Sequence, residues 1–478
     1  MSCQTHERRF FVKTLIYQIG RTMGDAKSFF FEEFCHESEL SSFFLKEYLS
    51  TKQQEAKVVL IYPVSILLNK KLLEELEKRN LDDFKQEIMN IIKDPSEYLK
   101  SPDFYIRKIP CEKDKDDILL VHSLGTYLGI ELKSHYDDIV LELFFDMVKR
   151  YLHEQIQTFY LDISSGLNIY ISAMIEAAKY FSTFFTLMNW SEENIPEIFI
   201  TFSDPIIGNT ASKYEIHLQK QVYPRIFTSP LSSYFKRTRH GVTLTESELN
   251  KFLKDEIFSN DSKELIKQLK SSLSKKLLKS FLIYSAIVNC VPLYLYYSDK
   301  HTEQEIFQEI EKFIDYAAKK LYFNFTESPR LNKEVYIEII CQLALYVGMI
   351  KMLQKHNIEL VNPESGISLK NLRSIFKKIL IQAGLSHSLM FLKNEADNTI
   401  KKINKYFKKY MDQIEKWVGM YEVMESRKST LNERNFFAHI GLEANITEVK
   451  KDAGEEIYAR YIGCLPLNEL SNYLLKNI

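Results

Sequence analysis

The first 225 residues alternate short apolar runs with longer amphipathic stretches, and this alternation restricts the fold more than any other feature. In "AKVVLIYPV" (56–64) apolar residues occupy consecutive positions, which is typical of a strand buried on both faces. Such strands separated by helical stretches predict a parallel sheet with helices on both faces. Four further strands are expected here: residues 12–20, 103–110, 158–166 and 196–205.

From about residue 245 onward the apolar residues recur with the period of a helix, as in "EQEIFQEIEKFIDYAAKKL" (303–321). We therefore predict an α/β plus all-α protein, which 478 residues are long enough to form. An N-terminal Rossmann-like parallel sheet is expected over residues 1–225 and a C-terminal helical domain over residues 263–478. Between them, residues 226–262 are predicted to be a basic connecting region.

Composition narrows the class of protein. Lys plus Arg (63) nearly cancels Asp plus Glu (64), so any basic site for nucleic acid must be local. The six cysteines form neither a CxxC pair nor a zinc spacing, so we expect reduced thiols. The N-terminus has no apolar signal-peptide core, and together with reduced thiols this predicts a cytoplasmic location. The apolar run 281–297 contains polar residues and a proline, which favours a buried core helix over a membrane span.

Two loops are candidate ligand sites, because ligands of open parallel sheets bind beyond the carboxyl ends of the strands. The loop after the first strand contains Gly20, Arg21 and Thr22. The loop after the 158–166 strand contains Asp162, Ser164, Ser165, Gly166 and Asn168. Its hydroxyls and helix N-terminus suit phosphate oxygens or ribose, although an ordinary strand-to-helix turn with a serine cap would have the same pattern. Neither GxGxxG nor a Walker motif occurs, which argues against a dinucleotide cofactor or NTP hydrolysis.

The stretch "NERNFFAHIG" (432–441) predicts a short helix with two different faces. Thr430 and Glu433 fit a capping box, and Gly441 fits a helix stop. Phe436 and Ile440 are spaced to anchor one side of this helix in the helical domain.

On the other side, Asn435 and His439 are four residues apart and share a face, with Arg434 next to Asn435. An arginine fork binds phosphate, and a histidine can move a proton to or from a ribose hydroxyl at neutral pH. This set suits RNA cleavage by the neighbouring 2′-hydroxyl, which needs no metal, and two copies across a two-fold axis would double it. Spacing alone favours the plainer alternative, a surface arginine and a partly buried histidine.

A family resemblance adds to this interpretation. "RNFFAH" resembles the Arg-polar-x-x-x-His signature of HEPN ribonucleases. "YLDISSGLNIY" resembles the Asp-x-Thr-His-Gly strand-loop signature of the CRISPR-associated Rossmann fold (CARF), and "FSDP" after the next strand also fits. Ser164 keeps the hydroxyl of the family threonine, whereas Ser165 replaces the family histidine. The order of the two domains is similar to that of the CARF–HEPN ancillary ribonucleases of type III CRISPR systems.

This resemblance implies an endoribonuclease, activated by a cyclic oligoadenylate and independent of metal, that cleaves single-stranded RNA in antiviral defence. It implies no resident cofactor, the cyclic tetra-adenylate as the favoured activator, and a homodimer, with higher homo-oligomers left open. Arg434, Asn435 and His439 are then the expected catalytic residues, and the two loops are the expected activator site.

Two rival functions remain open at this stage. A CARF-type transcriptional regulator would need a compact helix-turn-helix module, for which the basic stretch 236–240 is too short. A sensor or scaffold without nuclease activity would not need the intact set of arginine, asparagine and histidine.

Overall fold

The computed structural model describes residues 14–477, apart from residues 80, 110–114, 155, 165, 194, 206–212, 225, 239–243, 259–263, 361–363 and 463–465. The chain divides into two compact units. Unit 1 consists of Met1–Phe185, Asn194–Pro224 and Glu311–Ile337, and unit 2 of Thr186–Glu193, Arg225–Ile310 and Glu338–Ile478.

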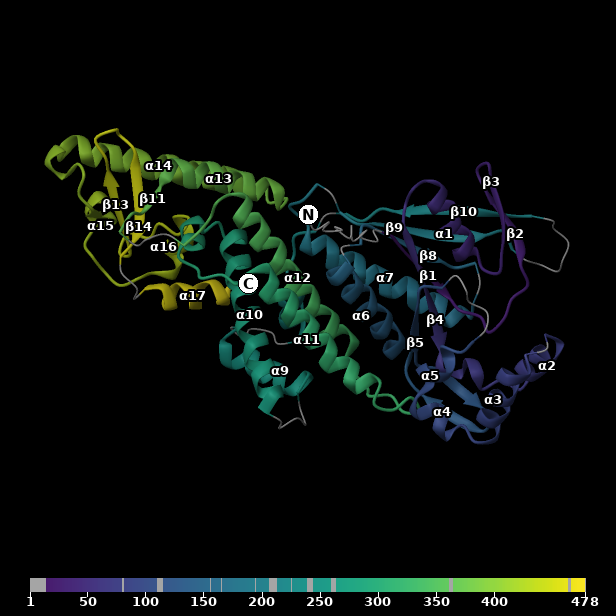
Figure 1. The fold of residues 1–478 in the computed structure, drawn as a ribbon. Helices are drawn as coiled ribbons and strands as arrows, with labels where there is room; N and C mark the ends of the chain where they lie inside the picture. Colours follow the sequence, from purple (N-terminus) through teal and green to yellow (C-terminus); the bar gives the residue numbers. More distant parts are fainter. Residues whose placement is uncertain are drawn as a thin grey trace, which may run out of the picture. The chain divides into compact units, whose positions relative to one another are not determined.

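Unit 1 is built around an eight-stranded sheet with the order β3-β2-β10-β9-β8-β1-β4-β5 (Figure 1). The strands are β1 Thr14–Ile19, β2 Lys27–Phe31, β3 Phe34–Ser38, β4 Ala56–Pro63, β5 Asp117–Val121, β8 Thr158–Asp162, β9 Glu197–Ser203 and β10 Tyr214–Gln221. The five strands β9, β8, β1, β4 and β5 are parallel, whereas β10 pairs antiparallel with β9. This confirms the predicted Rossmann-like parallel sheet.

Helices cover both faces of this sheet, as the continuous apolar strands require. They are α1 Ser41–Thr51, α2 Lys71–Lys78, α3 Asp82–Lys93, α4 Ser96–Lys100, α5 Pro102–Ile106, α6 Tyr136–Glu154 and α7 Asn168–Met188. Ile16 of β1 packs into a core cluster with Phe44 of α1. Phe159 of β8 instead contacts Phe181 of α7, with ring centroids 4.6 Å apart. Neighbouring positions along the strands therefore bury different faces of the sheet.

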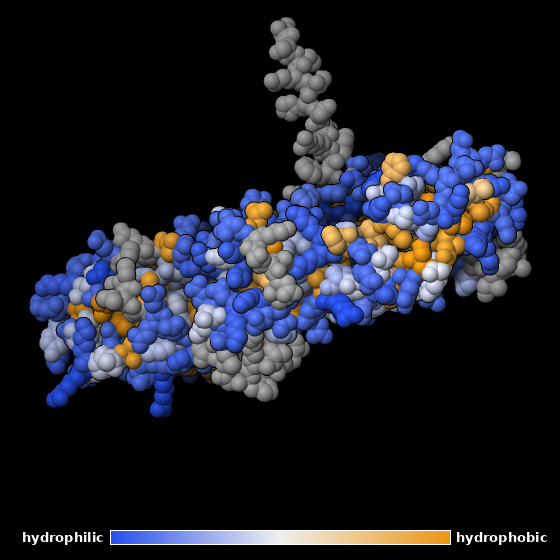
Figure 2. Space-filling model, turned by 90° about the horizontal axis from the view of Figure 1, so that it is seen from below, coloured by the Kyte–Doolittle hydropathy of each residue, from blue (hydrophilic) through white to orange (hydrophobic). Residues whose placement is uncertain are grey.

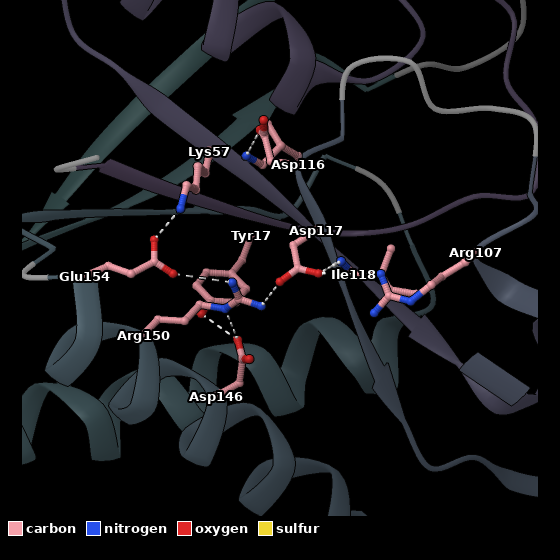
Figure 3. A network of polar contacts seen from close by, with 10 residues as sticks. Tyr17, Lys57, Arg107, Asp116, Asp117, Ile118, Asp146, Arg150 and Glu154 are labelled. Atoms are coloured by element: carbon pink, nitrogen blue, oxygen red, sulfur yellow. Dashed lines mark hydrogen bonds and ion pairs between the residues drawn. The ribbon is translucent and has the colours of Figure 1, made fainter. Parts of the chain in front are cut away.

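A polar network ties α6 to the sheet (Figure 3). Arg150 of α6 donates to Asp146 and Asp117, each at 2.8 Å, and its side chain is only 13% exposed. The hydroxyl of Tyr17, in the middle of β1, donates to Asp146 at 2.8 Å. Burial alone would lower the pKa of Arg150, but Asp146 and the other groups around it raise that pKa, so the guanidinium stays charged.

A second buried pair links the carboxyl end of β5 to α6. His122 and Glu142 are both fully buried, and the backbone N–H of His122 donates to Glu142 at 2.9 Å. Burial disfavours the imidazolium, yet the contact with Glu142 outweighs it and raises the pKa of His122. The other ring nitrogen lies 3.3 Å from the backbone oxygen of Asn324, in the turn between α11 (Glu303–Leu321) and α12 (Lys333–Lys355).

Helices dominate unit 2, which also contains a small sheet. Its helices are α8 Pro230–Thr238, α9 Glu246–Glu256, α10 Glu264–Val288, α13 Leu369–Gln382, α14 His387–Lys409, α15 Met420–Val423, α16 Glu433–Ala438 and α17 Pro466–Lys476. The helices α11 and α12 belong partly to each unit. The small sheet has the order β11-β14-β13-β12, with β11 Ile367–Ser368, β12 Val418–Gly419, β13 Thr447–Lys451 and β14 Ile457–Tyr461. The sequence predicted no strands in the helical domain.

Several predicted elements differ from those observed. The strand expected over residues 103–110 is wrong: Pro102 begins the helix α5 there, since its fixed φ suits the first helical turn, and the parallel strand is β5. The region predicted as a connection, 226–262, contains α8 and α9, and α9 buries Leu249, Phe252 and Leu253. A short hairpin, β6 Leu124–Tyr127 and β7 Ile130–Lys133, was also not expected.

The apolar run 281–297 is buried, as predicted, but α10 ends at Val288 and a 3-10 turn follows over Pro292–Tyr296. Among the described residues, only α12 has the length and apolar composition of a membrane span, and 89% of its apolar window is buried within the protein. Figure 2 shows one face of the molecule, on which the largest group of hydrophobic residues lies over unit 1.

The buried Arg150 network generates a stability prediction. Arg150→Ala is expected to destabilise unit 1 by about 3 kcal/mol, because it leaves Asp146 and Asp117 without their shared cation. The matched control is Arg79→Ala, since Arg79 is 39% exposed in its ion pair with Asp25 and should cost under about 1 kcal/mol. Calorimetric melting and hydrogen exchange of the β1 amides measure both. Equal effects of the two variants would contradict the prediction.

Candidate functional site

The predicted short helix is confirmed as α16, Glu433–Ala438, but its cap is Asn432 rather than Thr430. The Asn432 side chain accepts from the backbone N–H of Asn435 at 3.0 Å, which satisfies a free helix donor. Glu433 opens the helix, and it accepts from Lys476 and Asn477 of the C-terminal segment, each at 3.1 Å. The capping box expected from Thr430 and Glu433 is therefore wrong, because the chain enters the helix two residues later.

The end of α16 follows the expected stop signal. Gly441 adopts a φ of +79°, and its N–H donates to the carbonyl of Phe436 at 2.8 Å. A side chain there would be strained, and its Cβ would lie 2.6 Å from Val291. Glycine thus both ends the helix and lets the chain pass close to the core.

The two faces of α16 have different surroundings. Phe436 and Ile440 are fully buried, and Phe436 contacts the ring of Tyr473 on α17. Arg434, Asn435 and His439 are exposed. Within the described part of the chain, no hydrogen bond or ion pair occupies the side chains of Arg434 and Asn435. The predicted set is therefore presented to solvent by a helix whose other face is anchored.

One acidic residue joins this set that the sequence did not reveal. Nδ1 of His439 lies 3.2 Å from Oε2 of Glu395 on α14. Glu395 precedes Arg434 by 39 positions, so no local spacing marks it. The same helix carries lysines whose side chains are exposed: Lys393, Lys401, Lys402, Lys405, Lys408 and Lys409. They add positive charge to the helix that contacts His439, as a site for RNA phosphates requires.

In unit 1 the structure brings the two candidate ligand loops together. β1 pairs with β8 in parallel, with Gln18 opposite Asp162, so Gly20 and the loop beyond Asp162 extend from neighbouring strand ends. Among the parallel strands, β4 and β5 follow β1 on one side of it, and the later strands β8 and β9 lie on its other side. The position between β1 and β8 is thus the switch point at which open parallel sheets bind ligands.

Close packing shapes both loops. Gly166 has a φ of +127°, and an added Cβ would lie 2.5 Å from Ile19 at the end of β1. Gly20 packs against Tyr62 of β4, whose ring an added Cβ would approach to 2.4 Å. The hydroxyl of Tyr62 donates to the carbonyl of Arg21 at 3.2 Å. Glycine is required at both positions because the loops pass directly over neighbouring strands.

Some polar side chains at this edge of the sheet are bonded within the protein, and others are at least partly exposed to solvent. Asp162 is buried and accepts from the backbone N–H of Ser164 at 2.9 Å, and the Ser164 hydroxyl accepts from Ser203 of β9 at 2.9 Å. These contacts organise the loop. Thr22 is half-buried, Asn168 is exposed, and Ser165 lies outside the described residues.

The "FSDP" stretch places a further cluster at the end of β9. Asp204, Glu215 and His217 each offer a potential metal-ligand atom within 4.8 Å of the others. Both oxygens of Asp204 already accept hydrogen bonds, from His217 and from the backbone N–H of Glu215, each at 3.0 Å. These two bonds lower the pKa of Asp204. The sequence analysis had assigned no metal ligands, and this cluster has no local ligand spacing that would have revealed it.

Comparisons with known proteins agree with this two-part arrangement. Residues 14–205 match the family model described as "CRISPR system endoribonuclease Csx1, CARF domain". Residues 390–463 match the model described as "CRISPR system endoribonuclease Csx1, HEPN domain". No curated protein matches the chain.

The first match covers the sheet from β1 to β9, and the second contains Glu395 and α16. The fold and the two matches define a nuclease with a sensor domain. The chain belongs to the CRISPR-associated CARF–HEPN ribonucleases.

The buried Asp162 gives a pH-dependent prediction. Burial raises the pKa of Asp162 against the opposing effects of Ser164, Ser41 and Arg21. A raised folded-state pKa contributes stability at low pH that is lost as the pH rises from the ordinary value of about 4 through the raised pKa. Asp162→Asn keeps an acceptor for Ser164 and cannot ionise. Its melting temperature relative to wild type should therefore rise with pH and level off above the raised pKa.

Thermal unfolding between about pH 4 and pH 8 measures this difference. The control is Asp204→Asn: the pKa of Asp204 is lowered, so this carboxyl group titrates below the measured range and its removal should change the melting temperature by a nearly constant amount. A melting difference for Asp162→Asn that is constant with pH would contradict the assignment.

Proposed function

We propose that this ribonuclease cuts single-stranded RNA at a centre formed by Arg434, Asn435 and His439, and that a cyclic oligoadenylate bound at the β1–β8 edge activates it. The observation that carries the first part is the exposed face of α16, within the region matched to the HEPN domain model. An unpaired arginine fork and an exposed imidazole on one helix are the groups that phosphate-ester cleavage by a ribose hydroxyl needs.

In this reaction the 2′-oxygen attacks the adjacent phosphorus and loses its proton, while the 5′-oxygen leaves and takes up a proton. His439 is suited to moving one of these protons. Arg434 is suited to neutralising the charge that accumulates on the phosphorane oxygens. Asn435 can donate to a phosphate oxygen. The products are a 2′,3′-cyclic phosphate and a free 5′-hydroxyl, and the balance requires no metal ion.

Two copies of α16 facing each other would supply a second arginine and histidine, so we propose a homodimer as the active form. Exposed apolar side chains next to the loop after β8 support such an assembly: Leu167 is 54% exposed, Ile169 39% and Phe202 36%. Hydrophobic groups this close to a polar ligand edge suit a second copy packed beside it. A symmetric ring of nucleotides would then meet the same loop from each protomer.

The sheet edge suits the activator for chemical reasons. Asn168 begins α7, an N-terminus at which free backbone N–H groups favour phosphate oxygens, and its own side chain is exposed and unpartnered in the described chain. Arg21 lies on the neighbouring loop and adds positive charge. Phosphates and ribose hydroxyls of an oligoadenylate fit these donors.

The helices α11 and α12 offer a route for the signal, because each belongs partly to unit 1 and partly to unit 2. Their shared turn is held at the carboxyl end of β5 by His122 and Asn324. Lys333, at the start of α12, contacts Asp137 of α6 at 2.6 Å and Glu176 of α7 at 2.7 Å. A shift of α7 on activator binding would therefore reach α12 directly.

The nuclease proposal is tested with labelled single-stranded RNA, purified protein and EDTA, with and without cyclic tri-, tetra- and hexa-adenylate. Cleavage is expected with one of the rings, with a 2′,3′-cyclic phosphate product. His439→Ala should lower the rate at least about 100-fold, because a proton-transfer group is lost. Arg434→Lys should also be slow, since a point charge cannot replace the planar fork. His387→Ala, a histidine on α14, is the control. A strict requirement for Mg²⁺ or Mn²⁺, or an active His439→Ala variant, would contradict the proposal.

The activator site is tested with Asn168→Ala. We expect its Kd for the activating ring to rise about five- to tenfold, because one side-chain hydrogen bond is lost. The activator concentration needed for cleavage should rise by the same factor. Gly166→Leu should also block binding, but the contact with Ile19 means that it disturbs β1 as well.

The control is Asn90→Ala, an exposed asparagine on α3 in the same unit. Calorimetry and gel-based cleavage measure the two effects. Unchanged binding by Asn168→Ala would exclude its side chain from the site. If none of the rings bound to wild type, the activation half of the proposal would fail and the nuclease half would stand.

A further inference from the structure

The contact between Glu395 and His439 joins two helices that no sequence motif connects. Oε2 of Glu395 lies 3.2 Å from Nδ1 of His439, and the side chains are 25% and 47% exposed. Leu392, Ala396 and Thr399 are buried and fix the rotation of α14 about its axis. The carboxylate is therefore presented to α16 by a helix that cannot easily turn away.

Neither Glu395 nor His439 has another partner for its side chain among the described residues. On α14, the positions three and four residues from Glu395 are Phe391, Leu392, Asn398 and Thr399, which offer no cation. In the described chain, His439 is the one group to which the Glu395 side chain is hydrogen-bonded, and Nε2 of His439 has no partner. One ring nitrogen is thus occupied by protein, and the other is left for substrate.

The chemistry of imidazole gives this arrangement a consequence. A neutral histidine carries its proton on one ring nitrogen only, and the hydrogen bond made by that nitrogen selects the tautomer. A carboxylate at Nδ1 can only accept, so it favours Nδ1–H and leaves the lone pair on Nε2. It also restricts rotation of the ring, and a base oriented by a third group is the usual arrangement around an activated hydroxyl.

We propose that Glu395 is a positioning residue for His439: it holds the Nδ1 proton, so that Nε2 exchanges a proton with the ribose oxygen during RNA cleavage. This inference rests on the proposed role of His439. Glu395 itself does not touch the RNA or gain a proton in the reaction. Its effect is to keep the reactive nitrogen free and correctly aimed.

The kinetic test uses the full-length protein and saturating activator. Glu395→Ala should lower kcat about ten- to a hundredfold with little change in KM, because the lost hydrogen bond orients the reacting group rather than binding RNA. Glu395→Gln keeps an acceptor oxygen and should restore most of the activity. The control is Asp397→Ala, an acid two residues away on α14 that pairs with Arg373 and not with His439.

The second measurement does not depend on activity. Histidine ring ¹⁵N shifts, recorded well above the ordinary histidine pKa of about 6.5, report the tautomer, and His439→Ala assigns the signal. Wild type should show the Nδ1–H form, and Glu395→Ala should shift the population toward the Nε2–H form. Melting temperatures of all variants check the fold.

The outcomes separate the two proposals. An active His439→Ala variant would overturn the proposed nuclease centre. If His439→Ala were inactive while Glu395→Ala cut RNA at the wild-type rate, only the positioning role would be wrong. A wild-type His439 found in the Nε2–H form would also overturn it, whether or not RNA is cleaved.

Discussion

A parallel sheet must bury both of its faces, and this constraint arranges everything else in unit 1. With apolar side chains above and below the strands, polar groups remain mainly at the strand ends or in fully paired contacts. Arg150 links α6 to Asp117 at the amino end of β5 and, through Asp146, to Tyr17 of β1 (Figure 3). At the opposite end, Asp162 and Ser164 organise a loop. Paired polar groups therefore stabilise the sheet at both ends, while the carboxyl end also keeps exposed donors for a ligand.

The proposed nuclease centre depends on a helix that could not form alone. Six residues are too few for a stable isolated helix in water, so the position of α16 comes from tertiary contacts. Phe436 is buried against Tyr473, and Glu433 is held by the C-terminal segment. Because these contacts bury the other face of α16, Arg434 and His439 can face solvent without disturbing the packing of the core. In both units, therefore, the packing of apolar residues holds a short polar segment at the surface: the loop after β8 in unit 1 and α16 in unit 2.

Several features could be read from the sequence because they are local. The strands β1, β4, β8 and β9 were predicted from consecutive apolar residues, α11 from its helical period and α16 from the spacing of its apolar and polar residues. The stop at Gly441 follows from its conformational freedom. The helix α5 was mistaken for a strand, because its five residues are too few for a period to show. In the small sheet of unit 2, β11 and β12 have only two residues each, and β13 and β14, with five residues each, were also missed.

By itself, the sequence determined the two fold classes, their order and the residues on the exposed face of α16, since these depend on periods and spacings within one segment. Only the tertiary structure decided which distant segments meet. It placed the loops after β1 and β8 side by side, anchored the α11–α12 turn at His122, and brought Glu395 to His439. Such contacts join residues 44 or more positions apart through the packing of whole elements, and no local preference of the backbone encodes them.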